Sequence, residues 1–413
     1  MITQPSPARL PELLAPAGSF EKLVTAIHYG ADAVYLGGKR FSLRTRSTNF
    51  TDQELQEAVS YAHAHGVKAY VTVNIFAHNR DFEAMPDYLA YLADIGADGL
   101  IVSDPGVLQT ARRVAPRLPL HLSTQANVTN LESARFWQAQ GVTRLNLARE
   151  LSLAEIAAIR QGVGMQLELF VHGALCISYS GRCLLSQYLT GRSANRGDCA
   201  QPCRYQYALV EEKRAGQFFP VIEDERGTYI LNAKDLCLLS QLPELLATGV
   251  DSLKIEGRMK SIYYVGSVVR VYRAALDHLA TAPSSAQGVF PAAFLQELAT
   301  VGTRSFTENF FAGQPGREGM LYDSPRAAQP HTLLGVVREQ GGELPLIEVR
   351  TTTRIGERLE YLGPGLATSA HTIMEMKNPM TGLTLEQTNP GDRILLTTTP
   401  AAADWEVNGL LRK

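Results

Sequence analysis

The sequence predicts an α/β architecture: a (β/α)8 barrel of the TIM type with a cysteine-rich insertion, followed by a small all-β, barrel-like domain. Three observations predict it. Between residue 11 and about residue 280, short apolar runs alternate with amphipathic stretches that close on glycine. From residue 331 the apolar side chains recur at every second position, which is typical of half-buried strands. Four of the five cysteines lie between residues 172 and 204.

Eight apolar runs are the expected barrel strands. They are residues 11–15, 31–37, 67–75, 98–104, 118–124, 143–148, 166–172 and 251–257. The segments YGADAVYLG, IGADGLIVS, QGVTRLNLA and TGVDSLKIE repeat one order, in which a helix ends, a glycine follows and a buried parallel strand begins. No strand is followed by the glycine motif of dinucleotide-binding sheets, so the repetition favours a closed barrel over a doubly wound sheet.

Amphipathic stretches between these runs are the expected helices, and Ser19, Thr51 and Ser152 are their expected N-caps. Among these stretches are residues 19–29, 52–65, 82–95, 131–140, 153–161 and 239–248.

The pattern divides the chain into three parts. Residues 1–280 are the expected barrel, and its cysteine-rich loop covers about 172–226. Residues 281–330 are an expected connector, because TAPSSAQG has the composition of a linker and only AAFLQELATV has a helical pattern. Residues 331–413 contain the runs TLLGVVRE, LPLIEVRTT, ERLEYLG and DRILLTTT, which predict a small β-barrel or sandwich.

The composition is that of a globular protein of ordinary charge. With 413 residues, of which 45% are hydrophobic, the chain can form one large and one smaller domain. A net charge of -2 argues against a polycation, so RNA contact would require a local patch. No apolar run approaches a membrane span, and MITQPSPARL lacks the parts of a signal peptide, so we expect a cytoplasmic protein without membrane contact.

Four cysteines, Cys176, Cys183, Cys199 and Cys203, form a candidate metal centre. Glycines and small polar residues separate them, so the backbone can bring the four thiols together. Disulfides are disfavoured in the cytoplasm, and structural zinc usually uses tight C-x-x-C pairs, whereas six, fifteen and three residues separate these cysteines. A four-thiolate iron–sulfur cluster fits this irregular spacing best. Cys237, in the apolar segment NAKDLCLL, is expected to be buried and not a ligand.

Polar residues follow the predicted strands at the end where barrels of this type carry their active sites. These candidate site residues are Arg44 and Arg46 in the loop FSLRTR, Asn74, His78, Gln125, Asn127, Arg149, His172, Lys254, Glu256 and Arg258. Arg182 belongs to the cysteine segment, which leaves the seventh strand at the same end. For Arg149 with Glu150 and for Lys254 with Glu256, an ion pair that closes the barrel rim is the alternative to a functional role.

Several segments resemble a known family. They are ELLAPAGSFEKLVTAIHYGADAVYLGG, LSTQANVTN, the cysteine segment HGALCISYSGRCLLSQYLTGRSANRGDCAQPCR, YILNAKDL and DSLKIEGRMKSIYYV. Together they resemble the collagenase-like peptidase family, the thirty-second family of peptidases of unassigned mechanism, over roughly residues 11–280. Within it, the length and the C-terminal β-domain most resemble the prephenate-dependent tRNA uridine hydroxylases, which make 5-hydroxyuridine at the wobble position.

The resemblance implies a [4Fe–4S] cluster on Cys176, Cys183, Cys199 and Cys203, with prephenate as co-substrate and tRNA and an electron donor as partners. Guanidinium groups bind carboxylates in a bidentate manner, so the arginines of the mouth are the expected ligands of this small dicarboxylate. They are Arg44, Arg46, Arg149, Arg182 and Arg258. The expected proton-transfer residues are His172 and Glu256, and Lys254 is a third expected catalytic residue. The expected contacts to a flipped base are Asn74, Gln125 and Asn127, and His78 is a further expected substrate-binding residue.

Two alternatives belong to the same resemblance. Relatives hydroxylate a cytidine in the large ribosomal RNA, and the family label implies a peptidase, which is a hydrolase. A metalloprotease would need a motif such as H-E-x-x-H, which is absent, and thiolates bound to iron cannot act as nucleophiles. The tRNA uridine hydroxylase is therefore the favoured hypothesis.

Overall fold

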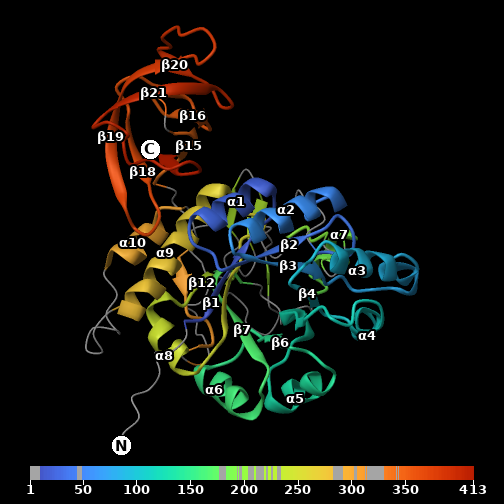
Figure 1. Ribbon diagram of the computed structural model, residues 1–413. Helices are drawn as coiled ribbons and strands as arrows, with labels where there is room; N and C mark the ends of the chain where they lie inside the picture. The colour runs from blue at the N-terminus through green and yellow to red at the C-terminus, as the bar shows by residue number, and fades with distance from the viewer. Residues whose placement is uncertain are drawn as a thin grey trace, which may run out of the picture.

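A computed structural model describes most of the chain. It covers residues 10–43, 49–175, 183–192, 194, 198–202, 209–210, 218–219, 222–224, 227–229, 234–281, 292–301, 305–311, 313, 330–340, 342 and 344–413. The chain folds into a parallel eight-stranded barrel surrounded by helices and a second, antiparallel six-stranded barrel at its C-terminal end (Figure 1). Both parts of the predicted fold class are confirmed.

The large barrel closes through one pairing between its first and last members. The strand order is β13-β1-β2-β3-β4-β5-β6-β7, and β13 pairs in parallel with β7. Each strand overlaps one of the eight predicted runs. The bounds are β1 Glu12–Pro16, β2 Ala33–Gly37, β3 Lys68–Val73, β4 Gly99–Val102, β5 Leu120–Leu122, β6 Arg144–Asn146, β7 Gln166–Ala174 and β13 Ser252–Ile255.

Helices connect these strands and cover the outside of the barrel. They are α1 Phe20–His28, α2 Asp52–Ala64, α3 Met85–Asp94, α4 Pro105–Val114, α5 Leu131–Ala139, α6 Leu153–Gly162, α8 Leu242–Ala247 and α9 Ile262–Thr281. The three predicted N-caps are confirmed, because Ser19, Thr51 and Ser152 each accept a backbone hydrogen bond from the first helical turn. None of the described helices is both long and apolar enough to span a membrane.

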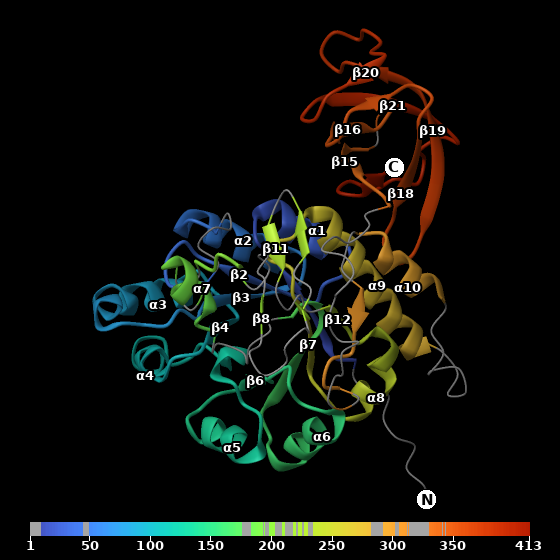
Figure 2. The same ribbon diagram turned by 180° about the vertical axis from the view of Figure 1, so that it is seen from behind.

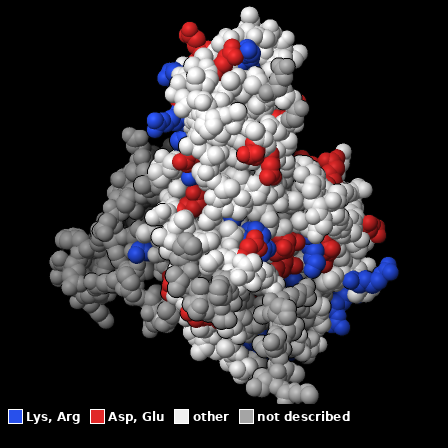
Figure 3. All heavy atoms as spheres, turned by 60° about the vertical axis from the view of Figure 1, so that its left-hand side comes forward, with Lys and Arg blue, Asp and Glu red and all other residues white. Residues whose placement is uncertain are grey.

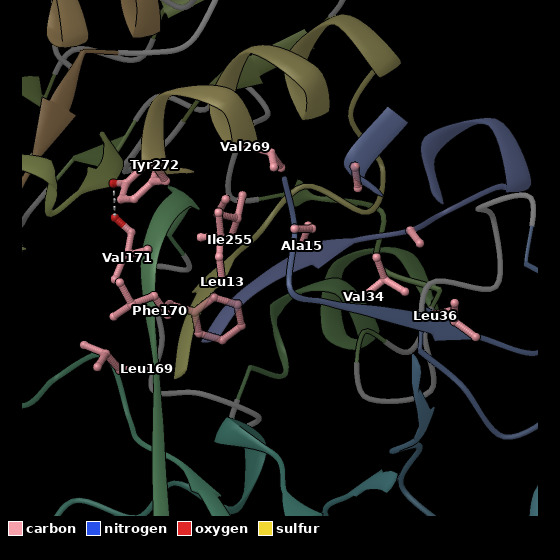
Figure 4. Close-up of a cluster of buried hydrophobic side chains, with 14 of the residues drawn as sticks. Leu13, Ala15, Val34, Leu36, Leu169, Phe170, Val171, Ile255, Val269 and Tyr272 are labelled. Atoms are coloured by element: carbon pink, nitrogen blue, oxygen red, sulfur yellow. Dashed lines mark hydrogen bonds between the residues drawn. The ribbon is translucent and has the colours of Figure 1, made fainter. Parts of the chain in front are cut away.

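Alternation along the strands gives the barrel two cores. Residues such as Leu13 and Val34 face the helices, and α9 packs over them, so that the Tyr272 hydroxyl donates a hydrogen bond of 2.8 Å to the Val171 carbonyl (Figure 4). A smaller cluster fills part of the interior. It consists of Leu14, Ala33, Tyr35, Tyr70 and Ile101. The rest of the barrel interior is polar, which positions the site described below.

The cysteine segment leaves the barrel at the end of β7 and returns beside it. The returning strand β12, Asp235–Cys237, pairs antiparallel with the last residues of β7, and Asp235 lies opposite Ala174. Strand β14, Phe306–Thr307, pairs with β12 in turn. Between these ends the structure describes helix α7, Leu185–Thr190, and two short hairpins, which Figure 2 shows from behind. The hairpins join β8 Leu209–Val210 to β9 Phe218–Phe219, and β10 Ile222–Asp224 to β11 Gly227–Tyr229.

The C-terminal barrel is closed in the order β15-β16-β21-β19-β18-β22. Its strands are β15 Leu333–Glu339, β16 Leu346–Val349, β18 Arg358–Leu362, β19 Thr368–Lys377, β21 Arg393–Thr399 and β22 Leu410–Arg412, and β17 Thr353–Arg354 pairs with β20 Gln387–Thr388 outside it. The prediction found four of the six barrel strands. It missed β19, whose first half has mostly exposed side chains, and β22, which has only three residues.

The two barrels are joined by specific buried contacts along α1, α9 and helix α10, Ala292–Ala299. The Tyr29 hydroxyl, after α1, donates to the Leu362 carbonyl at 2.7 Å and accepts from the Leu410 amide at 2.9 Å. Arg412 forms a 2.8 Å ion pair with Glu297. These hydrogen bonds and ion pairs fix the C-terminal barrel against one side of the large barrel, as Figures 1 and 2 show.

Candidate active site at the barrel mouth

The strand register defines which side chains face the barrel interior. Residues that are paired across neighbouring parallel strands have side chains on the same face of the sheet. The pairings of Arg144 with His121 and Gln166, and of Asn146 with Glu168, therefore identify side chains that face the barrel interior. We call the end of the interior where the strands finish the barrel mouth, because barrels of this type carry their sites there.

An ion pair closes the opposite end of the interior. Arg144 Nη1 donates to Glu12 Oε1 at 2.6 Å, and the Tyr70 hydroxyl donates to Glu12 Oε2 at 2.7 Å. Burial raises the pKa of Glu12, but the hydrogen bonds from Arg144 and Tyr70 and the positive charges nearby outweigh burial, so the pKa lies below its usual 4.5. The carboxylate is therefore charged at neutral pH, and this end of the barrel is a structural plug.

Three buried side chains form what we call the floor cluster: Asn146 on β6, Glu168 on β7 and Lys254 on β13, each at most 3% exposed. Glu168 accepts hydrogen bonds from Lys254 Nζ at 2.8 Å and from Asn146 Nδ2 at 2.9 Å. Lys254 Nζ also lies 4.5 Å from the ring centroid of Tyr35 and 5.4 Å from that of Phe170. A cation over two aromatic faces beside a carboxylate is held firmly in one position.

The orientation of the Asn146 amide follows from its partner. A carboxylate only accepts hydrogen bonds, so the donating Nδ2 must face Glu168 and Oδ1 must lie on the other side of the amide group. Within the described part of the chain, Oδ1 of Asn146 is buried and has no hydrogen-bond partner. The floor cluster therefore holds an acceptor whose direction is fixed.

The suggested rim ion pair between Lys254 and Glu256 is replaced by a different arrangement. Lys254 pairs with Glu168, deeper in the barrel, and the Glu256 carboxylate accepts a hydrogen bond of 3.1 Å from the Tyr35 hydroxyl. Glu256 follows β13 at the mouth and is half-buried. Its predicted role in proton transfer stays a prediction.

Arg149 is likewise held by the backbone and not by Glu150. Its Nη1 donates to the Ala174 carbonyl at 3.0 Å, and its guanidinium lies 5.3 Å from the Phe170 ring centroid. Ala174 is the last residue of β7, so Arg149 stands beside the point where the cysteine segment begins.

A second cation reaches the mouth from the loop after β13. Arg258 is 4% exposed, and its Nη1 donates to Ser42 Oγ and to Thr72 Oγ1, both at 3.1 Å. The guanidinium packs on Gly37, where a Cβ atom would stand 2.6 Å from Nη1, so only glycine leaves room. Lys22 Nζ donates to the Arg258 carbonyl at 3.2 Å.

Two amides form a pair next to these residues, after β3 and β5. Asn74 Nδ2 donates to Gln125 Oε1 at 2.7 Å, and Asn74 Oδ1 accepts from the Leu43 amide at 3.3 Å. Asn127 follows in the left-handed region, with φ of 54°, and its Oδ1 is buried without a hydrogen-bond partner in the described residues. The structure thus brings Asn74 and Gln125 together, as the strand ends predicted.

Two predicted site residues lie elsewhere. His172 was expected at the mouth, but its ring contacts Tyr264 and Tyr272 of α9 and Phe306 on the outer side of β7. The pairing of β13 with β7 shifts after Lys254, so that β7 contains one extra residue at this point. The side chain of His172 therefore faces outward instead of into the barrel. Burial, with a smaller effect from Lys260, lowers the pKa of His172 to about 3, so the ring is neutral at physiological pH.

His78 is exposed and precedes the short helix η1, Asn79–Glu83, with its backbone amide bonded to Asp81. The predicted roles of His78 in substrate binding and of His172 in catalysis stay predictions. Three of the expected arginines, Arg44, Arg46 and Arg182, and two of the expected cluster ligands, Cys176 and Cys203, lie outside the described residues.

The other two candidate ligands are present as free, partly exposed thiols. Cys199 Sγ accepts a hydrogen bond of 3.3 Å from the backbone amide of Gln201, which adopts a left-handed φ of 58°. Backbone amides that donate to sulfur are a usual feature around cluster thiolates, so this side chain fits the role. Cys237 is buried, as expected, 3.9 Å from the Tyr272 hydroxyl.

Sequence reasoning missed the inward-facing polar residues Arg144, Asn146 and Glu168. Their signal is present in TRLNLA and QLELFVH, where charged and amide side chains alternate with leucine in strands that have to be buried on both faces. A polar residue in such a strand needs a partner inside the barrel, which would have identified the floor cluster.

Comparison with known proteins gives a consistent family. The model of peptidase family U32 matches residues 18–321. tRNA hydroxylation protein P1 of Bacillus subtilis strain 168 is 41% identical over 365 residues, covering 88% of this chain and 86% of that protein. tRNA hydroxylation protein P of Escherichia coli K12 is 38% identical over 396 residues, covering 86% of each chain.

Two further similarities cover less of the two chains compared or have a lower identity. A 23S rRNA 5-hydroxycytidine synthase of Escherichia coli K12 is 38% identical over 322 residues, which are 76% of this chain but 47% of that protein. A solved structure of a U32 peptidase is 18% identical, covers 62% of this chain and 97% of its own, and superposes with a TM-score of 0.40. On the family match and the full-length relatives, this chain belongs to peptidase family U32.

Proposed function

We propose that this protein hydroxylates C5 of a uridine in tRNA, at the wobble position, with prephenate as co-substrate and a [4Fe–4S] cluster as cofactor. One observation carries the proposal: relatives named for tRNA hydroxylation match 86% or more of this chain, which is more than the large barrel and the connector together. The ribosomal RNA alternative has less support, because this chain spans under half of that relative. Peptidase activity remains the alternative given by the family description.

The inward-facing polar residues are compatible with a base as substrate. Enzymes that modify a base in RNA take it out of the stack and read its edge with hydrogen-bonding side chains. The mouth offers the amides of Asn74 and Gln125, the Glu256 carboxylate and, below them, Lys254. These groups can bind and orient a planar, polar ring, and Glu256 can hold a proton at its carboxylate.

Cations at the mouth suit a small dicarboxylate. Arg258 and Lys22 lie on one side of it and Arg149 on the other. Burial lowers the pKa of Lys22, and the nearby charge of Arg258 lowers it further, so an anion bound between them would favour the charged lysine. Arg44, Arg46 and Arg182 are proposed as further ligands of the same dicarboxylate.

Replacement of C5–H by C5–OH is a two-electron oxidation that needs an oxygen donor, and a [4Fe–4S] cluster supplies one-electron transfer when bound. Cys183 and Cys199 would hold it together with Cys176 and Cys203. The amide of Gln201 would stabilise negative charge on the Cys199 sulfur.

The test is mass spectrometry of nucleosides from total tRNA of a strain that lacks this protein. We expect 5-hydroxyuridine and its derivatives to disappear, and to return with the wild-type gene but not with a Cys199→Ser variant. Nucleosides from ribosomal RNA of the same strain are the control. Unchanged tRNA together with loss of 5-hydroxycytidine from ribosomal RNA would contradict the proposal and favour the cytidine alternative.

A further inference from the structure

We infer that Asn146, oriented by Glu168, accepts a hydrogen bond from N3–H of the target base and thereby selects uracil over cytosine. The inference rests on the proposed function, because it assumes that an RNA base enters the barrel mouth. It assigns a specificity role to a residue that the strand pattern alone did not single out.

The side-chain oxygen of Asn146 has a fixed direction. Glu168 Oε1 lies 2.9 Å from Asn146 Nδ2, and the carboxylate also accepts from Lys254 and Arg144, so it has no proton with which to satisfy the amide oxygen. A rotated amide would place oxygen against carboxylate oxygen, which is repulsive. Asn146 therefore presents Oδ1, and only Oδ1, away from Glu168.

Among the described residues, this buried oxygen of Asn146 lacks a hydrogen-bond donor. Asn146 is 2% exposed, and in the described structure its Oδ1 accepts no hydrogen bond. Buried acceptors without a donor are rare in native structures, and each requires an explanation such as a ligand. A ligand that donates one hydrogen bond at this position would supply the missing partner.

One layer of interior side chains separates the floor cluster from the mouth. Residues two positions apart on a strand share a face, so each interior residue has an interior neighbour one step nearer the mouth. On five adjacent strands these neighbours have small side chains. They are Gly37, Thr72, Ser103, Ser123 and Ala148. Arg258 covers Gly37 and Thr72, so a flat ring would approach the floor cluster past Ser103, Ser123 and Ala148.

The hydrogen-bonding groups of the floor cluster are complementary to one edge of uracil. Lys254 donates and Asn146 Oδ1 accepts, so the floor cluster matches a carbonyl beside an N–H group. Uracil has this arrangement at N3–H, between two carbonyl oxygens. Cytosine has an unprotonated N3 at that position and an amino group in place of O4, so it would leave Oδ1 of Asn146 facing a lone pair. The carboxylate groups of prephenate offer no donor to this oxygen.

The experiment measures binding of three RNA stem-loops to the full-length protein by fluorescence anisotropy. They differ only at the target position, which holds uridine, cytidine or 3-methyluridine. We expect wild-type protein to bind the uridine stem-loop roughly 5- to 150-fold more tightly than the other two, since an unpaired buried acceptor is costly. In Asn146→Ala, which removes the acceptor and leaves space for the methyl group, both ratios should approach one.

Asn127→Ala is the matched comparison, because Asn127 also has a buried, unpartnered Oδ1 nearer the mouth. Collapse of the ratios in Asn127→Ala with retention in Asn146→Ala overturns the assignment. Tight but equal binding of uridine and 3-methyluridine stem-loops by wild-type protein overturns it without any variant. Absence of binding to every stem-loop overturns the proposed function, and the inference with it.

Discussion

At the scale of single residues, the barrel interior places charges where water does not reach. Arg144 is 3% exposed and contacts both Glu12 and Glu168, which connects the plug of the barrel to the floor cluster. Removal of one partner from such a network leaves the other charges buried without compensation, and that cost exceeds the net contribution of the intact pair.

Arg144→Met should therefore destabilise the protein by about 3–5 kcal/mol. We expect the melting temperature to fall by roughly 6 °C or more, measured by circular dichroism. Arg135→Met is the control, since it removes an arginine from an exposed ion pair with Glu132 and should cost no more than about 1 kcal/mol. Equal melting temperatures for the two variants would contradict this account.

The same residue controls the response to acid. Because the pKa of folded Glu12 is below 4.5, its contribution to stability is present above that pH and is lost as the pH falls through the folded value. Without Arg144, burial would raise the pKa of Glu12 instead, so its protonation on acidification would stabilise the fold. Unfolding by urea between pH 6 and pH 4 should show a shallower loss of stability in Arg144→Met than in wild type.

His172 makes a second pH prediction of known sign. Its folded pKa of about 3 is below the unfolded value of 6.5, so the unfolded chain binds a proton first and stability falls as the pH decreases from 6.5 towards 3. The loss should approach about 1.4 kcal/mol per pH unit. His172→Phe should lack this dependence, and a titration by NMR should show a neutral His172 ring at pH 5. A charged ring at that pH would contradict the burial that the structure shows.

At the scale of elements, strands and capped helices could be predicted because their signals are local. The spacing of apolar residues, the terminating glycines and the N-cap residues each extend over only a few positions of the sequence. All eight barrel strands and the three N-caps lie where these signals predicted them. The position of His172 could not be predicted, because it depends on a register shift between β7 and β13, two strands separated by the whole insertion. In the floor cluster, Lys254 was predicted as a site residue but Asn146 and Glu168 were missed, because the three residues come from different strands.

Helix α1 gives a prediction about how elements hold the two barrels together. Tyr29→Phe would leave the Leu362 carbonyl and the Leu410 amide buried without their shared partner. The expected cost is about 1–3 kcal/mol for each group, seen as lower resistance of the C-terminal barrel to limited proteolysis. Tyr91→Phe, whose hydroxyl contacts the Asp52 carbonyl in a less buried setting, is the matched control. A proteolysis rate equal to that of wild type would show that the apolar contacts suffice.

At the scale of the whole molecule, the C-terminal barrel has no excess of positive charge with which to attract the phosphates of tRNA. Residues 331–413 contain eight Lys and Arg and ten Asp and Glu, so 8 − 10 gives a net charge of −2. Charges of both signs are interspersed on the face shown in Figure 3. Any RNA contact by this domain must therefore depend on a few individual arginines and on shape, as the overall composition also indicated.

Arg354, Arg358 and Arg393 are exposed on this barrel and are the best candidates. If all three contact phosphates, their joint replacement by alanine should reduce the slope of log K against log salt by about 2–3. Replacement of Arg112, Arg113 and Arg117, which are exposed at the end of α4, is the control with the same change of charge. Equal effects of the two triple variants would show that only overall charge matters.

The pairing of Ala174 with Asp235 has a consequence for how this protein can change. The segment between them begins and ends at two residues that lie directly opposite each other on paired strands, so its two ends stay in place whatever the length of the chain between them. The entropy of closing such a loop grows only slowly with its size. The cysteine segment can therefore be exchanged as a unit: a short turn from Ala174 to Asp235 would preserve every strand of the barrel, and a different segment could occupy the same two positions without a change in the scaffold beneath it.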